Sequence, residues 1–178
     1  PHFSQGATTA ITEPTATKNM TACFGMFYGG LAQLLAGIFD MKKGSTFGAT
    51  AFMTYGAFWM GLALFTILNA AGVWTGASQA QGEVSKFVFV RADQMMLSLY
   101  GILTTIFFVG TLSINRALQV LFASLAALFF LLAIGLSFPI VTKIAGWWGL
   151  FVAAVAFYTG SAEPVSYTHL RAHETRED

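Results

Sequence analysis

The sequence is short of charge, has a single cysteine and has no histidine outside its two ends. Of its 178 residues, 10% are charged and 56% are hydrophobic, and the mean hydropathy is +0.66. Soluble domains are typically about one quarter charged, so this composition favours an integral membrane protein embedded in a lipid bilayer. The net charge of +1 leaves no basic patch for phosphate groups, which argues against a nucleic-acid partner.

Groups that could bind a metal or carry catalysis are also scarce. Cys23 lies in an apolar stretch and has no second cysteine for a disulfide, and His2, His169 and His173 lie in the terminal segments. A metal centre needs several such ligands close together. A catalytic triad or carboxylate pair needs ionisable groups inside the fold. We therefore predict no metal, no cofactor and no enzymatic activity.

Five apolar segments are long enough to cross a bilayer as helices. A helix needs about 20 apolar residues to span the hydrocarbon core, and the first segment is 20 residues long without a charge. The five predicted membrane helices occupy residues 20–39, 47–72, 94–112, 117–138 and 144–160. A break is predicted from Pro139 to Lys143, because proline cannot continue the backbone hydrogen-bond ladder. The predicted fold is all-α, an integral membrane helical bundle.

Small residues in the first span predict close helix packing. Gly25 and Gly29 stand four residues apart, as do Ala32 and Ala36. In membrane helices, small residues at this spacing line a face that the backbone of a neighbouring helix can approach. Gly44 follows in the next loop, where glycine suits the end of a helix. These features indicate packing and turns, not chemistry.

The two ends of the chain differ in composition from the predicted bundle, residues 20–163. Residues 1–19 are polar and lack the charged start and apolar run of a signal peptide. Residues 164–178 contain SYTHLRAHETRED, which is similar to a translated adaptor or vector tail and is not expected to contribute to the fold or the function. One loop is long, residues 73–93, and its apolar part at 84–90 can lie on the membrane surface or extend the next helix.

Lysine and arginine placement predicts the orientation in the membrane. Lys42, Lys43 and Arg116 are concentrated in two short loops, residues 40–46 and 113–116. Cytoplasmic loops carry an excess of lysine and arginine next to helix ends. We therefore expect these two loops to lie in the cytoplasm.

No predicted span has an ionisable residue firmly in its interior, which limits how a solute could be held. Intramembrane charges are the usual mark of an ion site. Without them, a small anion must be bound by hydroxyls, amides, ring edges and helix ends, or must pass in its protonated form. A monocarboxylic acid with a pKa of about 4 to 5 can do the latter under acidic conditions.

The best candidates to line such a path lie within about one turn of the second span, at Thr54, Tyr55 and Phe58. A tyrosine can narrow a pore with its ring and donate a hydrogen bond to a carboxylate. From spacing alone, packing in the protein interior is the simpler role for Tyr55. Gln33 can touch solute, but a hydrogen bond across helices is favoured. Trp59 is expected to pack or anchor.

Several stretches of the chain resemble one known family. FGMFYGGLAQLLAG, followed by KKGSTFGATAF and TYGAFW, resembles the second and third transmembrane helices of the acetate uptake transporter family. GTLSINRALQVLFASLAALFFLLAIG and AGWWGLFVAAVAFY continue the resemblance in order, over residues 20–163. The resemblance implies a six-helix fold. The family's first helix, with its Asn-Pro-x-Pro-Leu-Gly-Leu signature, has no counterpart here, and we expect that it was lost upstream of Pro1.

This resemblance implies a function and a constriction. It implies proton-coupled transport of acetate or other short monocarboxylates, and of succinate, across the plasma membrane by a homo-oligomer, a hexamer with a pore in each subunit. It also implies a hydrophobic constriction formed by Tyr55, Leu125 and a phenylalanine of the missing helix. Two alternatives remain open: a non-transporting membrane sensor or scaffold of the acetate response, and a passive channel for small neutral solutes.

Overall fold

A computed structural model describes the backbone of residues 13–71 and 83–174 and the side chains of residues 19–71 and 90–161. Within these ranges all regular structure is helical. The chain divides into two compact units, Pro1–Gln81 and Gly82–Asp178. Each unit is described by itself below.

Five helices in the described ranges are long and apolar enough to cross a membrane. They are Asn19–Lys42, Thr46–Ala70, Val90–Thr111, Arg116–Gly135 and Pro139–Ser161. The prediction of an all-helical protein with five spans is therefore confirmed. Every observed span begins and ends within a few residues of its prediction, apart from the start of the last one.

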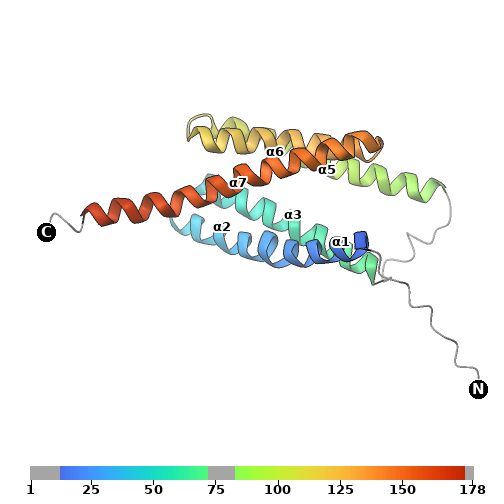
Figure 1. The fold of residues 1–178 in the computed structure, drawn as a ribbon, viewed down its shortest axis with the longest axis horizontal. Helices are drawn as coiled ribbons and strands as arrows, with labels where there is room; N and C mark the ends of the chain where they lie inside the picture. The colour runs from blue at the N-terminus through green and yellow to red at the C-terminus, as the bar shows by residue number, and fades with distance from the viewer. Residues whose placement is uncertain (1–12, 72–82, 175–178) are drawn as a thin grey trace, which may run out of the picture. The chain divides into compact units, whose positions relative to one another are not determined.

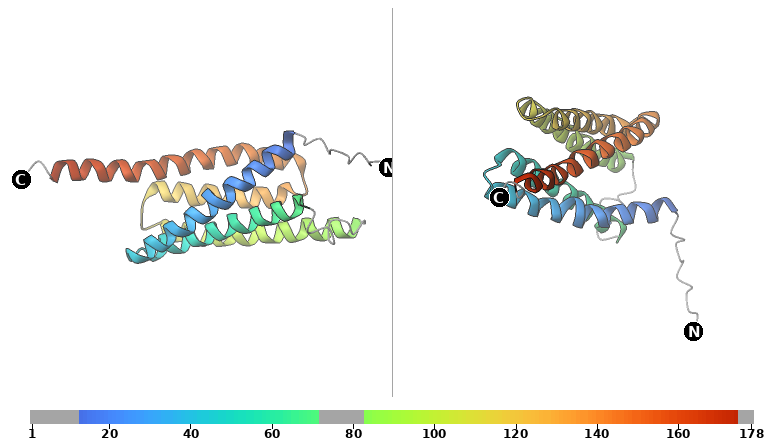
Figure 2. Two further views of the ribbon diagram at one scale, coloured as in Figure 1. Left: turned by 90° about the horizontal axis from the view of Figure 1, so that it is seen from below. Right: turned by 60° about the vertical axis from the view of Figure 1, so that its left-hand side comes forward.

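The first unit is a helical hairpin. One arm is a continuous helical run of α1 (Glu13–Phe24), the π-helix η1 (Gly25–Ala32) and α2 (Gln33–Lys42). The other arm is α3 (Thr46–Ala70), which lies alongside η1 and α2 (Figures 1 and 2). An apolar run this long without a breaker forms a helix because every backbone polar group is then bonded within the segment.

The turn between the two arms is a Schellman motif centred on Gly44. The backbone N–H of Ser45 donates to the carbonyl of Asp40 at 3.0 Å, and that of Gly44 to the carbonyl of Met41 at 3.0 Å. Gly44 has a φ of +80°, which glycine adopts without the steric cost of a Cβ. The predicted helix end is confirmed, and the turn places Lys42 and Lys43 together at one end of the hairpin.

Glycines bring the two arms into backbone contact. A Cβ on Gly30 would overlap Met60, and one on Gly37 would lie 2.8 Å from Met53 Cγ. A Cβ on Gly56 would lie 3.0 Å from both the carbonyl oxygen of Gly30 and the backbone nitrogen of Leu34. These positions tolerate little beyond hydrogen, so the predicted close packing of small residues is observed within this hairpin.

The π-helical segment η1 keeps this glycine face turned toward α3. The small residues buried on the first arm are Ala22, Gly25, Gly30 and Gly37, at intervals of three, five and seven residues. The five-residue step exceeds one α-helical turn and matches the i to i+5 bonding of a π-helix. Ala32 is exposed, so it does not belong to the packed face on which its spacing suggested it would lie.

The second unit contains α5 (Glu83–Thr111), α6 (Arg116–Gly135) and α7 (Pro139–Glu174), and α6 contacts both of the others (Figure 1). The apolar segment 84–90 forms the first part of α5. This agrees with one of the two predictions for it, that it extends the next helix. A break does separate the fourth and fifth spans, but it lies at residues 136–138 and not at the predicted Pro139 to Lys143. α7 begins at Pro139, because proline is favoured in the first helical turn, where its missing N–H has no partner to lose.

Polar side chains secure the helix ends of this unit. The Asn115 side chain caps α6 by accepting a hydrogen bond from the Leu118 backbone N–H at 2.8 Å. Gln119 Nε2 donates to the carbonyls of Thr111 and Leu112 at 3.3 and 3.2 Å, and so closes the end of α5. These bonds satisfy backbone groups that a helix end would otherwise leave without partners.

The terminal segments are only partly described. Residues 1–12 lie outside the described ranges, whereas residues 13–19 are helical. The backbone of α7 is helical through Glu174, and residues 175–178 lie outside the described ranges. The proposed boundaries at residues 19 and 164 therefore stay predictions.

Candidate functional site

Tyr55 lies on the face of α3 that packs inside the protein. Its side chain is 7% exposed, and it precedes Gly56, where α3 comes closest to the backbone of Gly30 and Leu34. The position of Tyr55 therefore depends on close contact between the hairpin arms. Its neighbours Thr54 and Phe58 are half-buried.

Trp59 has a clear packing role. Its indole ring covers Gly25 and Gly29, where an added Cβ would lie 3.2 and 3.0 Å from the ring. Phe58 and Trp59 meet edge to face, with ring centroids 5.8 Å apart. The large indole ring fits between the arms because the residues that it faces on the first arm are glycines without side chains. Trp59 thus holds the arm opposite Tyr55 in place.

The hydroxyls and amides of the hairpin differ in their partners. Thr50 and Thr66 each donate to the carbonyl four residues earlier, at 2.8 Å, so they are satisfied within α3. Thr54 and the half-buried Gln33 make no side-chain hydrogen bond within the part of the chain that the structure describes. Both are therefore available to a solute or to another helix.

Leu125 belongs to the second unit and is half-buried on α6, between the buried residues Ser124 and Ala126. The Ser124 hydroxyl donates to the Leu121 carbonyl at 3.0 Å, and the Ser124 carbonyl accepts a hydrogen bond from Trp148 Nε1 at 2.9 Å. The turn that carries Leu125 is therefore bonded to α7. Because Tyr55 and Leu125 lie in different units, their pairing in one constriction stays a prediction.

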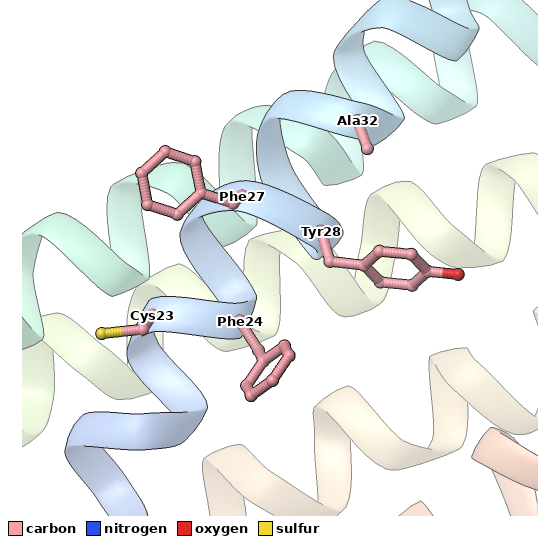
Figure 3. A pocket seen from close by; sticks show the side chains of 5 residues that line it. All are labelled: Cys23, Phe24, Phe27, Tyr28 and Ala32. Atoms are coloured by element: carbon pink, nitrogen blue, oxygen red, sulfur yellow. The ribbon is translucent and has the colours of Figure 1, made fainter.

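A hollow of about 640 Å³ lies along α1 and η1. It is lined by Cys23, Phe24, Phe27, Tyr28 and Ala32. Figure 3 shows Phe24 and Tyr28 extending to one side of the helix and Cys23 and Phe27 to the other. These aromatics carry no local sequence signal that marks them as a site. Their apolar surface suits lipid or another helix and has no cation with which to bind an anion.

Charged groups lie near the helix ends. Asp40 of α2 is half-buried and faces the first turn of α3, close enough that a Cβ on Gly48 would overlap its Oδ2. Negative charge is stabilised at a helix N-terminus, so this carboxylate has a structural role as a boundary charge. No cluster of three or more His, Cys, Asp or Glu that could hold a metal is found among the described residues.

A cluster of polar side chains joins the first turns of the third span to the end of α6. Gln94 Nε2 donates to the Ser137 hydroxyl at 2.7 Å and to the Ala133 carbonyl at 3.1 Å. Arg91 Nη1 in turn donates to Gln94 Oε1 at 2.9 Å. Gln94, predicted to lie at the end of a span, thus makes the kind of cross-helix amide bond that was expected of Gln33, whose own role stays a prediction.

Comparison with known proteins identifies the family. The model of the GPR1/FUN34/yaaH family matches residues 2–173, which is nearly the whole chain. The chain belongs to the GPR1/FUN34/yaaH family. The predicted resemblance to acetate uptake transporters is thereby confirmed. The chain is a multi-pass membrane protein of a transporter family and not an enzyme.

Relatives within this family are similar over most of the chain. The succinate-acetate/proton symporter SatP of Escherichia coli K12 is 41% identical over 150 residues, 83% of this chain and 74% of SatP. Acetate permease A of Emericella nidulans is 34% identical over 85% of this chain and 52% of its own length. A solved structure described as the bacterial acetate channel SatP has a TM-score of 0.71 at 37% identity, over 83% of this chain and 76% of that one.

Proposed function

We propose that this protein transports acetate and other short monocarboxylates, and also the dicarboxylate succinate, across the plasma membrane as a homo-oligomer, with a hexamer as the expected assembly. The observation that carries the proposal is the match to SatP in both sequence and fold. Transport of acetate or related carboxylates is named for relatives from bacteria and a fungus. We infer that the same class of solute passes here.

The spans constrain the form in which the solute crosses. The charged residues of the described spans, such as Asp40, Arg91 and Lys143, lie within a few residues of span ends. A carboxylate in the apolar centre would lack a counter-charge, and an unpaired charge there is costly. We propose that acetate passes as the neutral acid, or with its charge shared among hydroxyls and ring edges. Thr54 and Gln33 are candidate polar contacts.

The proposed constriction combines Tyr55 with Leu125. Tyr55 is buried beside the close backbone contact at Gly56, and Leu125 is half-buried on a turn bonded to α7. Both positions are held by neighbours, as a narrow passage requires, because a freely moving side chain would not set a width. The Tyr55 ring would exclude larger solutes while its hydroxyl bonds the carboxyl group.

The experiment is uptake of radiolabelled acetate into vesicles that contain the purified protein, expressed from its complete gene. We expect acetate uptake well above that of empty vesicles at an external pH of about 5, which is close to the pKa of a carboxylic acid. Tyr55→Ala is expected to change the uptake rate or the preference between acetate and larger acids severalfold. Tyr158→Ala is the matched control, since Tyr158 is 69% exposed on α7.

One relative is described as a proton symporter and a solved structure as a channel, so the mechanism needs its own test. Proton coupling predicts that an inward proton gradient drives acetate above its equilibrium distribution. A passive channel for neutral solutes predicts flux that only equalises the concentrations of the neutral acid. A sensor or scaffold predicts no flux under either condition, and that result would overturn the proposal.

A further inference from the structure

One hydrogen bond joins α7 to the turn of α6 that carries Leu125. The indole Nε1 of Trp148 donates to the main-chain carbonyl of Ser124 at 2.9 Å, and Ser124 directly precedes Leu125. Ser124 is 5% exposed, so the bond lies in the interior of the unit. The indole N–H is a donor only, and in an apolar setting it would lose its single partner if this bond opened.

The surrounding contacts hold the bond in one geometry. Ala145 and Val152 of α7 are buried on the same side as Trp148, and an added Cβ on Gly149 would reach Leu128 of α6 at 3.7 Å. The Trp148 ring also lies 5.4 Å from that of Phe151. The face of α7 around Trp148 is therefore packed against the side of α6 that includes Ser124 and Leu128.

Leu125 lies at the edge of this contact on α6. One residue along an α-helix turns the side chain by about 100°. Ser124 and Leu128 share a face because they are four residues apart, and Leu125, three residues before Leu128, borders that face. A bond at the Ser124 carbonyl thus fixes the position of the backbone that carries Leu125, while the Leu125 side chain points about 100° away from that of Ser124.

We propose that Trp148 is a positioning residue for Leu125, and that its hydrogen bond to Ser124 sets how far Leu125 extends into the solute path. This inference rests on the proposed function, because it assumes that Leu125 narrows an acetate pathway. Trp148 would act through α6 and would not touch solute. Loss of the bond would let the turn move, and the passage would then discriminate less sharply between small acids of different size.

The adjacent tryptophan provides a matched control. Trp147 is 76% exposed, whereas Trp148 is 37% exposed and bonded to α6. Trp148→Phe removes the N–H and keeps an aromatic ring, and Trp147→Phe makes the same chemical change one residue away. A general effect of tryptophan loss on membrane insertion should appear in both variants. An effect on Leu125 should appear only in Trp148→Phe.

The measurement is the ratio of propionate to acetate uptake in vesicles, normalised to the amount of inserted protein. Cross-helix hydrogen bonds in membranes average somewhat over half a kilocalorie per mole, so Trp148→Phe is expected to raise the ratio about threefold. Trp147→Phe should leave the ratio unchanged. Leu125→Ala should raise the ratio by itself, and adding Trp148→Phe to it should have no further effect, because the positioned side chain is gone.

Each outcome has a defined meaning. If Trp148→Phe keeps the ratio of the unaltered protein while Leu125→Ala changes it, the positioning role is wrong and the transport function stands. If the unaltered protein takes up no acetate, the proposed function and this inference both fail. Should Trp148→Phe not fold, benzothienylalanine at position 148 keeps the ring shape and replaces the N–H with sulfur. A normal ratio in that variant would equally overturn the inference.

Discussion

Gly56, which faces backbone atoms of the opposite arm, offers a direct test of how closely the two arms of the hairpin pack. In Gly56→Ala, the new methyl group would lie 3.0 Å from the Gly30 carbonyl oxygen and from the Leu34 backbone nitrogen. Ordinary contact begins near 3.4 Å, so the backbones must separate by about 0.4 Å. Both obstacles are backbone atoms of the opposite arm and cannot rotate away, as the end of a flexible side chain could.

The expected magnitude follows from a comparison with Gly61→Ala on the same helix. An added Cβ on Gly61 would meet nothing within 4 Å. Each substitution raises helix propensity by about 1 kcal/mol, so this term cancels between them. What remains is the cost of overpacking at position 56, about 1 to 3 kcal/mol. For a chain of this size, that difference corresponds to a melting temperature lower by roughly 2 to 12 °C.

The assay is thermal unfolding of both variants in the same detergent, followed by acetate uptake in vesicles. Gly56→Ala should melt below Gly61→Ala, and its uptake should also fall, because Tyr55 is the adjacent residue and moves with the separating arms. Equal melting temperatures would show that the arms are not in backbone contact at Gly56. A lower melting temperature with unaltered uptake would instead separate the packing of Gly56 from the proposed role of Tyr55.

Two further predictions concern a helix cap and pH. Asn115→Ala removes the acceptor for the Leu118 N–H and should lower the free energy of unfolding by about 1 kcal/mol. Asn115→Asp keeps an acceptor and should preserve most of the stability of the cap. Thermal or denaturant unfolding of both variants measures the difference. If the neutral acid is the species transported, initial uptake at fixed total acetate should fall about tenfold per pH unit well above the acid's pKa of about 4 to 5. Uptake independent of pH between 6 and 8 would contradict passage as the neutral acid.

Some features of the functional site could be predicted from the sequence and others could not. The position of Tyr55 on a membrane helix followed from local composition, and the structure buries this residue. The bond from Trp148 to Ser124 had no signal in the sequence, because its partner is a main-chain carbonyl 24 residues away. Gln94 was similarly overlooked, since nothing in its local sequence indicates that it reaches the Ala133 carbonyl on α6 and the Ser137 hydroxyl just after α6.

The sequence by itself determined the five spans, the helical class and the glycine turn at Gly44. These depend on interactions within about 20 residues, because a long uncharged run must bond its backbone internally in lipid. Only the tertiary structure decided which small residues are packed. Gly30 is buried and Ala32 is exposed because a π-helical segment changes the helical phase to suit the opposite arm. Pro139 likewise begins a helix, since its effect depends on whether a preceding helix continues into it or a new one starts there.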